Sequence, residues 1–300
     1  SLKTISATSL LFLPWLLKFL WAPLLDRQAN WRSSLLTLQF SAVALALAMA
    51  LLDLQQGWTL LLIALLLFNA VAATQDILTD SLAIHVLGHA DRGLGNGIQV
   101  GAYRIGMILG GGLLLWVFAV QGWRVMFFFM AALLLLSTLP VFWLRATRDV
   151  QRTAHAHPVL RAGWHRLRQP GMLGFMLLIC GYKFGDSMAA SLVGPFMLDS
   201  GLDKTQIALI KGTVGSVAAL LGAACGGWLT FRFGRRNALL SCCLLQSASL
   251  VLYGLFALHI GGLSLLWAAS IAEHWFGGMA TVALFTLMMD ASDPQHAGTD

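Results

Sequence analysis

The sequence carries little charge. Its 300 residues include 19 Lys or Arg and 13 Asp or Glu, which together make up 11% of the chain. Soluble globular proteins carry about 25% charged residues, so the polar surface of a soluble domain of this size is missing. Intrinsic disorder is excluded as well, because it requires low hydrophobicity and 58% of this chain is hydrophobic. What remains is a polytopic membrane protein.

Cysteine is also scarce. The four cysteines lie inside apolar stretches and match no zinc or disulfide spacing, so we interpret them as small packing residues. They are Cys180, Cys225, Cys242 and Cys243. His85 and His89 are four residues apart, but the sequence shows no third metal ligand near them. We therefore predict no metal centre and no cofactor.

The formal net charge of +6 raises the question of a nucleic-acid partner. Such a partner requires a continuous basic patch. The Lys and Arg residues of this chain instead fall into short clusters between apolar runs. The sequence predicts no nucleic-acid binding, and the expected surroundings are a lipid bilayer.

Apolar segments of about 20 residues are typical of membrane-spanning helices. We count nine of them, and they predict an all-α membrane fold. The segments are 5–25, 34–52, 58–84, 94–120, 123–145, 171–198, 204–231, 235–258 and 262–289. A polar, arginine-rich stretch separates the fifth from the sixth. We predict an N-terminal helical bundle (1–146), a linker (147–170) and a C-terminal bundle (171–300).

The basic residues predict the orientation in the membrane. Alternate loops on one side hold 12 Lys or Arg, whereas the other side holds only Lys3, Arg124 and Lys204. Cytoplasmic loops carry an excess of Lys and Arg. The linker 147–170 is therefore predicted to be cytoplasmic, and the chain is expected to cross a membrane several times.

Eight ionisable residues lie at membrane depth, where each costs roughly 2.5–3.5 kcal/mol on insertion scales. They are Lys18, Asp76, Asp80, Arg104, Lys183, Asp186, Lys211 and Glu273. Residues of this kind face water-filled cavities or one another, and they mark the paths of solutes and protons. The alternatives are a structural pair of Arg104 with Asp76 or Asp80, a local Lys183–Asp186 pair, and snorkelling of Lys18 or Lys211 to an interface.

These charges and their neighbours predict a transport site. We assign substrate binding to the cations and to the aromatic and amide side chains beside them: Lys18, Trp21, Gln75, Tyr103, Arg104, Lys183 and Lys211. We assign proton coupling to the carboxylates, which are Asp76, Asp80, Asp186 and Glu273. Glu273 has no cation near it in the sequence, which favours a protonatable role.

Two other patterns concern movement. Glycines four residues apart, at Gly97 and Gly101 and at Gly106 and Gly110, allow close approach of a neighbouring helix. Two polar turns, Asp26–Arg27 and residues 232–236, look like the cytoplasmic loops by which the halves of facilitator transporters latch together, with an acid meeting a helix end or a basic residue. The gating candidates are Asp26, Arg27, Arg232, Arg235 and Arg236. The alternative for the arginines is that they serve only to orient the chain.

Five motifs in chain order resemble those of AmpG-type permeases of the major facilitator superfamily. They are residues 18–27 (KFLWAPLLDR), 74–80 (TQDIxxD), 103–112 (YRxGM followed by GG), 182–186 (YKxGD) and 277–281 (GGMxT). The resemblance covers nearly the whole chain. It implies two six-helix halves, of which this chain would hold helices two to ten.

The resemblance also implies a function. AmpG-type proteins import anhydro-muropeptides from the periplasm, and the related RhtX/FptX-type transporters carry ferric siderophores across the bacterial inner membrane, where this chain is therefore expected. The ending 296–300 looks like the siderophore branch, and the short loop after Arg27 lacks the long Gly-Arg-rich insert of the muropeptide permeases. We therefore predict a monomeric, proton-coupled siderophore importer that works by alternating access. The alternatives are a muropeptide permease and a non-transporting sensor or scaffold. The sequence shows no nucleophile, base or metal constellation of an enzyme.

Overall fold

The structure is a computed structural model that describes residues 10–26, 30–52, 58–144, 168–293 and 297–299. Every regular element in these ranges is helical, and none of their residues forms a strand. Each predicted span coincides with a helical segment, and six described stretches are long and apolar enough to cross a membrane. The prediction of an all-α membrane fold is confirmed.

The described residues form two compact units. The first draws on residues 1–86, 109–159 and 292–300, and the second on residues 87–108 and 160–291. The predicted division into bundles 1–146 and 171–300 stays a prediction. Most of the predicted linker 147–170 lies outside the described residues.

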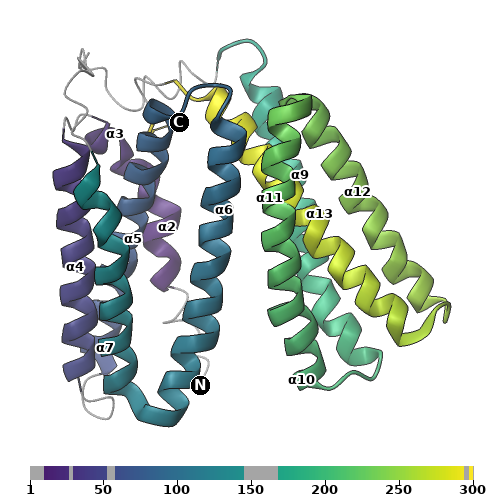
Figure 1. Ribbon diagram of the computed structural model, residues 1–300, viewed down its shortest axis with the longest axis horizontal. Coiled ribbons are helices and arrows are strands. Elements are labelled where there is room, and N and C mark those ends of the chain that lie inside the picture. Colours follow the sequence, from purple (N-terminus) through teal and green to yellow (C-terminus); the bar gives the residue numbers. More distant parts are fainter. Residues whose placement is uncertain (1–9, 27–29, 53–57, 145–167, 294–296, 300) are drawn as a thin grey trace. The chain divides into compact units, whose positions relative to one another are not determined.

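The first unit is built on α4 (Trp31–Leu51), α5 (Trp58–Val86) and α7 (Leu114–Trp143). Figure 1 shows these three helices side by side, and α4 packs against both of the others. Small side chains of α4, such as Ala46 and Ala50, bury Phe127 of α7 between the helices. Gly122, with φ near 81°, breaks the helical path inside α7 at the turn that the sequence predicts.

The first predicted span is a broken helix. It runs through η1 (Leu10–Phe12), α2 (Leu13–Leu17), η2 (Lys18–Leu20) and α3 (Ala22–Leu25). Pro14 and Pro23 each remove a backbone N–H donor, and a 3₁₀ turn separates the two α-helical pieces. Short 3₁₀ stretches inside a helix mark strained or functional positions. Here the turn carries Lys18, one of the charged residues at membrane depth.

The second unit contains α6 (Arg92–Ile108), α9 (Met172–Asp199), α10 (Lys204–Ile207), α11 (Gly215–Phe233), α12 (Arg235–Ala257) and α13 (Gly262–Ala291). The helix α13 packs against both α11 and α12, while α6 packs against α11 (Figure 1). Cys242 is fully buried with Met279 and Ala280 at the α12–α13 contact. This is the packing role that the sequence predicts for a cysteine.

The glycine pattern of α6 is confirmed in part. A Cβ atom on Gly97 would lie 3.3 Å from the carbonyl oxygen of Ala223, and one on Gly101 would lie 3.3 Å from Leu220 Cδ1. Both neighbours belong to α11, so these glycines permit the close approach. The expectation for Gly106 and Gly110 is wrong within the described residues, because a Cβ there would meet nothing within 4 Å. Gly110 instead lies in η3 (Leu109–Leu113), a wider π-helical turn.

A matched pair of alanine substitutions tests this difference. We expect Gly97→Ala to destabilise the protein by about 1 kcal/mol or more, because the added methyl group overpacks the α6–α11 contact. We expect Gly111→Ala to be neutral or slightly stabilising, since a Cβ there meets nothing within 4 Å in the described residues and alanine favours helix over glycine. Thermal unfolding in detergent measures both. Equal losses in the two variants would contradict the assigned contact.

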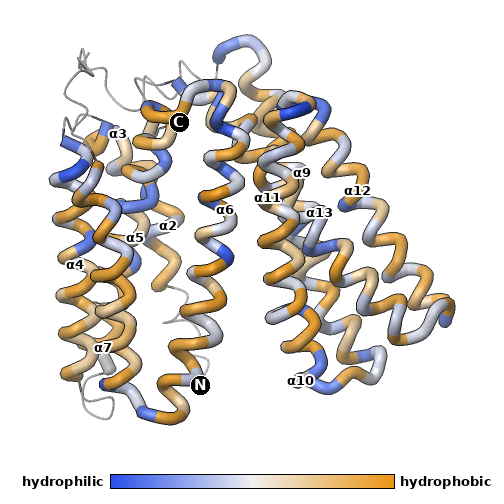
Figure 2. The backbone as a smooth tube through the Cα atoms, in the orientation of Figure 1, coloured by the Kyte–Doolittle hydropathy of each residue, from blue (hydrophilic) through white to orange (hydrophobic). Residues whose placement is uncertain are grey.

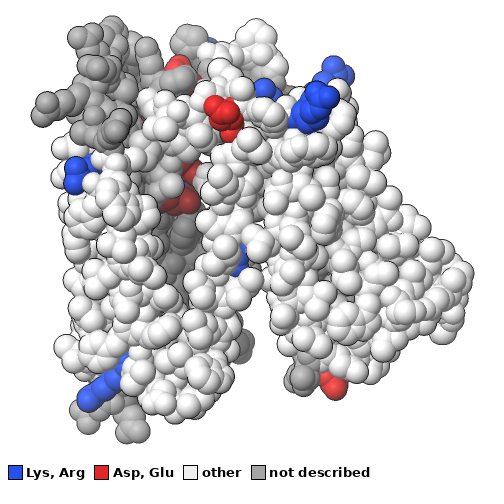
Figure 3. Space-filling view, in the orientation of Figure 1, with Lys and Arg blue, Asp and Glu red and all other residues white. Residues whose placement is uncertain are grey.

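Charge is rare on the described surface. Hydrophobic residues dominate the helix tubes in Figure 2, and the hydrophilic positions gather mainly toward helix ends. In the face drawn in Figure 3, Lys, Arg, Asp and Glu are few among white residues. The ionisable side chains that remain within the spans are therefore exceptions to the apolar character of the helices.

Candidate transport and gating sites

The first site is an ion pair between the broken helix and α5. Lys18 Nζ lies 2.6 Å from Asp76 Oδ2, and each side chain is about 35% exposed. The 3₁₀ turn Lys18–Leu20 presents the ammonium group to the middle of α5. At this distance the contact is a charge-assisted hydrogen bond, which is about twice as strong as a neutral one.

Two tryptophans fix the broken helix on either side of this pair. Trp15 Nε1 donates to Asn69 Oδ1 at 3.1 Å, and Trp21 Nε1 donates to Thr74 Oγ1 at 3.1 Å. Lys18 Nζ also lies 5.6 Å from the centre of the Trp15 ring, within the range of a cation–π contact. The broken helix is thus held to α5 by side chains on three successive turns.

The remaining predicted site residues of α5 and α6 belong to different units, and their surroundings differ. Gln75 is half-buried, and within the described ranges its side chain forms no hydrogen bond. Asp80 takes part in a polar or electrostatic interaction. Tyr103 is 65% exposed. Arg104 belongs to the second unit, so its expected pairing with Asp76 or Asp80 stays a prediction, whereas Asp76 has Lys18 as a partner.

A second polar cluster joins α9 to α12. Lys183 Nζ lies 3.7 Å from Asp186 Oδ2, and it also lies 5.8 Å from the ring centre of Tyr182 and 6.0 Å from that of Phe285. Gln246 Nε2 donates to Asp186 Oδ1 at 3.1 Å, and the Tyr182 hydroxyl donates to Gln246 Oε1 at 3.0 Å. The local Lys183–Asp186 pair is therefore present, and Gln246 connects it to the next helix.

Glu273 and Lys211 also belong to the second unit. Glu273 Oε2 is 2.7 Å from His274 Nδ1, and both side chains are about 15% exposed. The same His274 nitrogen is 2.8 Å from the Ser270 carbonyl oxygen; since a carbonyl oxygen only accepts, this nitrogen carries a proton. Lys211 lies in the π-helical turn η4 (Ala208–Val214) and donates to the Ala190 carbonyl oxygen at 3.2 Å.

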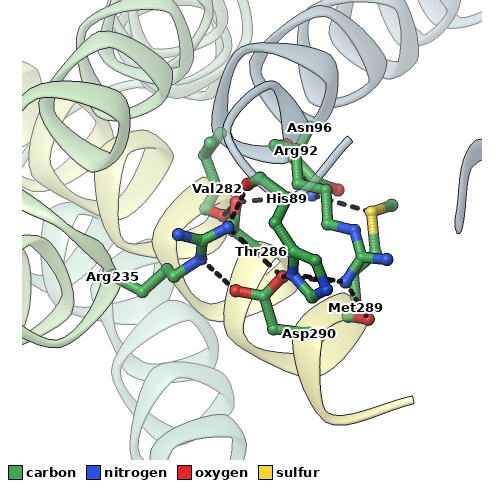
Figure 4. Close-up of polar contacts among 8 residues, drawn as sticks. All are labelled: His89, Arg92, Asn96, Arg235, Val282, Thr286, Met289 and Asp290. Atoms are coloured by element: carbon green, nitrogen blue, oxygen red, sulfur yellow. Dashed lines mark hydrogen bonds and ion pairs between the residues drawn. The ribbon is translucent and has the colours of Figure 1, made fainter. Parts of the chain in front are cut away.

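An acidic hub, Asp290, lies near the end of α13 (Figure 4). Its carboxylate pairs with Arg92 Nη1 at 2.9 Å, with Arg235 Nε, and with His89 Nδ1 at 3.2 Å. Arg92 is only 5% exposed and also donates to the Met289 carbonyl oxygen at 3.2 Å. One carboxylate thus connects α6, α12 and α13 at their predicted cytoplasmic ends.

Asp26 forms a second contact of this kind in the first unit. It accepts hydrogen bonds from the Gly298 and Thr299 backbone N–H groups at 2.7 and 2.9 Å and from the Thr299 hydroxyl at 2.6 Å. Of the other gating candidates, Arg27 lies outside the described residues. Arg232 and Arg236 are exposed and form no ion pair within the described ranges.

The family of the chain follows from its similarity to known proteins. A family model for the Major Facilitator Superfamily matches residues 2–299. The chain belongs to this superfamily. Its long apolar helices are those of a multi-pass membrane protein of this superfamily.

Two bacterial relatives are informative. The chain is 34% identical to the anhydromuropeptide permease of Escherichia coli over 99% of its own length and 62% of that protein. It is 31% identical to an uncharacterized protein of Haemophilus influenzae over 100% of its length and 75% of that protein. The resemblance to AmpG-type permeases is confirmed, and the facilitator chain spans less than two thirds of the Escherichia coli relative.

Solved structures support the fold alone. A bacterial homologue of the iron transporter ferroportin, in an outward-facing state, matches with a TM-score of 0.71 at 17% identity, over 98% of this chain and 78% of that one. The facilitator FucP, in an outward conformation, matches with a TM-score of 0.67 at 16% identity, over 96% and 80% of the two chains.

Several residues of these sites are not among the sequence predictions. Asp290 and Arg92 stand next to loops, where a charge is ordinarily solvated. Gln246 and Asn69 are uncharged and therefore do not stand out in a count of costly charges. The available signal was polarity inside an apolar span, because amides are rare there and join helices by hydrogen bonds.

Proposed function

We propose that this facilitator imports an amphipathic, anionic solute of the anhydromuropeptide class across the bacterial inner membrane. The observation that carries the proposal is the match to the Escherichia coli anhydromuropeptide permease over 99% of this chain. The Lys18–Asp76 pair between two anchored tryptophans supports it. An ammonium group suits a solute carboxylate, and indole rings suit the apolar faces of sugars.

The charges at membrane depth divide into two roles in this proposal. Lys18, Arg104, Lys183 and Lys211 bind anionic groups of the solute, assisted by Trp21, Gln75 and Tyr103. The carboxylates of Asp76, Asp80, Asp186 and Glu273 carry the coupled proton. When Asp76 takes a proton, its ion pair with Lys18 ends and the ammonium group is available to the solute. Proton uptake and solute binding then favour each other, as coupling requires.

The gates of this proposal are the two acidic contacts at helix ends. Asp26 holds the backbone around Gly298 and Thr299, and Asp290 holds Arg92 and Arg235. The remaining arginines of the gates are Arg27, Arg232 and Arg236. Ion pairs of this kind close one face of the transporter and open again in the other state, which is the basis of alternating access. The linker is cytoplasmic in this orientation.

A ferric siderophore is the second candidate solute. The sequence ending 296–300 favours it, and within that ending Gly298 and Thr299 contact Asp26. The distinguishing residues therefore belong to a proposed gate and not to the charges proposed to bind the solute. This position weakens the ending as evidence on the substrate, and we rank the siderophore second.

Uptake into proteoliposomes containing the intact transporter distinguishes these functions. We expect accumulation of a radiolabelled anhydromuropeptide when the outside is acidic, and loss of accumulation when a protonophore collapses the gradient. Accumulation of an iron-labelled ferric siderophore instead would assign the second candidate. A sensor or scaffold would accumulate neither solute, and accumulation that ignores the gradient would contradict proton coupling.

A further inference from the structure

Gln246 has an unusual position for an uncharged residue. It lies in the middle of α12, where it contacts two polar side chains of α9. Its Nε2 group donates to Asp186 Oδ1 at 3.1 Å, and its Oε1 atom accepts from the Tyr182 hydroxyl at 3.0 Å. The nitrogen and the oxygen of this amide thus each form a hydrogen bond with a residue of α9, and these residues belong to the site that is proposed to bind the solute and the proton.

These two contacts assign the direction of each hydrogen bond. A carboxylate accepts and an amide N–H donates, so Nε2 must face Asp186. The amide oxygen then faces Tyr182, whose hydroxyl has to donate. With Asp186 Oδ1 bound to the amide, Oδ2 is the oxygen that faces Lys183, at 3.7 Å. This distance exceeds that of a direct hydrogen bond, so Lys183 is only loosely paired.

We infer that Gln246 is a positioning residue of the transport site, whose amide holds Asp186 back from Lys183 so that the lysine ammonium receives an anionic group of the solute. This inference rests on the proposed function, because it assigns the solute to Lys183. Lys183 is 45% exposed and lies near the Tyr182 and Phe285 rings. Its remaining hydrogen-bond donors are therefore accessible to a carboxylate or phosphate oxygen.

The packing around Gln246 agrees with a defined amide position. A Cβ atom on Gly277 of α13 would lie 3.3 Å from Gln246 Nε2. Glycine at this position therefore leaves the room that the amide occupies. Gly277→Ala displaces the amide by a few tenths of an ångström without removing it, which gives a second variant that acts on the same hydrogen bonds.

The alternative is that Gln246 only joins two helices. Gln39 of the first unit provides the matched control, because it is a buried glutamine that donates to the Leu134 carbonyl oxygen at 2.8 Å and to Ser137 Oγ at 2.6 Å. It contacts no charged side chain among the described residues. Gln39→Leu therefore reports the cost of losing an amide that joins helices and does nothing else.

The first experiment measures uptake kinetics of the Gln246→Leu variant, with the labelled anhydromuropeptide or siderophore that the wild-type transporter accumulates. Without the amide, Asp186 closes on Lys183, so we expect the KM for uptake to rise about tenfold, with a smaller change in maximal rate. Gly277→Ala is expected to shift KM in the same direction by a smaller factor. Gln39→Leu is expected to lower protein yield while leaving KM unchanged.

The second experiment uses pH and the Gln246→Glu variant. The protonated form of the introduced carboxyl group presents one donor and one acceptor, as the amide does, whereas its ionised form repels Asp186. The titratable groups of this cluster within the described residues are Asp186, Lys183 and Tyr182 of α9, together with Cys242 and Cys243 of α12, which interact electrostatically with Tyr182. The α13 neighbour Gly277 is uncharged. We expect uptake by Gln246→Glu, relative to wild type, to recover as the pH falls. A ratio that stays flat with pH would overturn the inference.

A third measurement does not depend on transport. The infrared carboxylate band of Asp186, assigned by difference from Asp186→Asn, is expected to shift in Gln246→Leu and to stay in place in Gln39→Leu. An unshifted band, or equal KM values for Gln246→Leu and wild type, overturns the positioning role. If the wild-type protein accumulates neither solute, the proposed function fails, and the infrared shift still decides whether Gln246 positions Asp186.

Discussion

Replacing Lys18 with methionine, or Asp76 with leucine, is expected to reduce solute uptake by about 100-fold or more. Each change leaves one unpaired charge at membrane depth, where insertion of a lone charge costs roughly 2.5–3.5 kcal/mol. The pair is 2.6 Å long and about one third exposed. The loss in stability should therefore lie between that of exposed and buried ion pairs, at about 1–3 kcal/mol.

The double variant Lys18→Met/Asp76→Leu separates stability from transport. It removes both charges at once, so neither is left unpaired, and folding should recover toward that of the wild type. If the pair serves transport, uptake stays absent in the recovered protein. Arg32→Gln, which removes a positive charge near the start of α4, is the control for a change in net charge. A double variant that regains both stability and uptake would make the pair purely structural.

The sequence could predict the fold because the bilayer imposes a simple pattern. Apolar runs of about 20 residues locate the spans, and the structure places a helix at each of them. Irregularities within the helices are harder to predict. Hydrophobic periodicity carries no signal for the π-helical turns Leu109–Leu113 and Ala208–Val214. The break around Lys18 does have a signal in the sequence, because Pro14 and Pro23 each remove a backbone N–H donor.

The sequence predicts which charged residues belong to the sites better than it predicts which of them contact each other. Charges at membrane depth can be counted from the sequence, and Lys18, Asp76, Lys183 and Asp186 all occur in the described contacts. Which charge meets which depends on distances across the fold, so the partner of Asp76 could not be read from spacing. The roles assigned to these residues stay predictions that the proposed variants test.

The two predicted gating turns differ from the expectation in different ways. The sequence predicts that Asp26 meets a helix end or a basic residue, whereas in the described residues it accepts three hydrogen bonds from the turn residues Gly298 and Thr299. For the second turn, the sequence identifies Arg235 but not its partner. Asp290 was missed because it stands 201 residues from His89 and 198 from Arg92, and no local pattern links positions so far apart.

Replacing Asp290 with asparagine is the second change from which we expect a large effect. Arg92 is 5% exposed, and its guanidinium group pairs with Asp290. Removing the carboxylate takes this partner away from a buried charge, and breaking a buried pair costs roughly 3–5 kcal/mol. Arg235 loses the same partner. We therefore expect a marked fall in thermal stability, and Asp290→Glu should preserve most of it.

The same variant tests whether the hub is a gate. In a protein with all four cysteines replaced, a single cysteine at Val100, which is 3% exposed on α6, reports opening beneath the hub. A membrane-impermeant maleimide applied from the cytoplasmic face should label it at least about tenfold faster in Asp290→Asn than in the parent. Asp199→Asn, at the exposed end of α9, is the control, because it removes an acid without a described ion pair. Faster unfolding with unchanged labelling of the folded protein would show that Asp290 stabilises this end of the helices without controlling access.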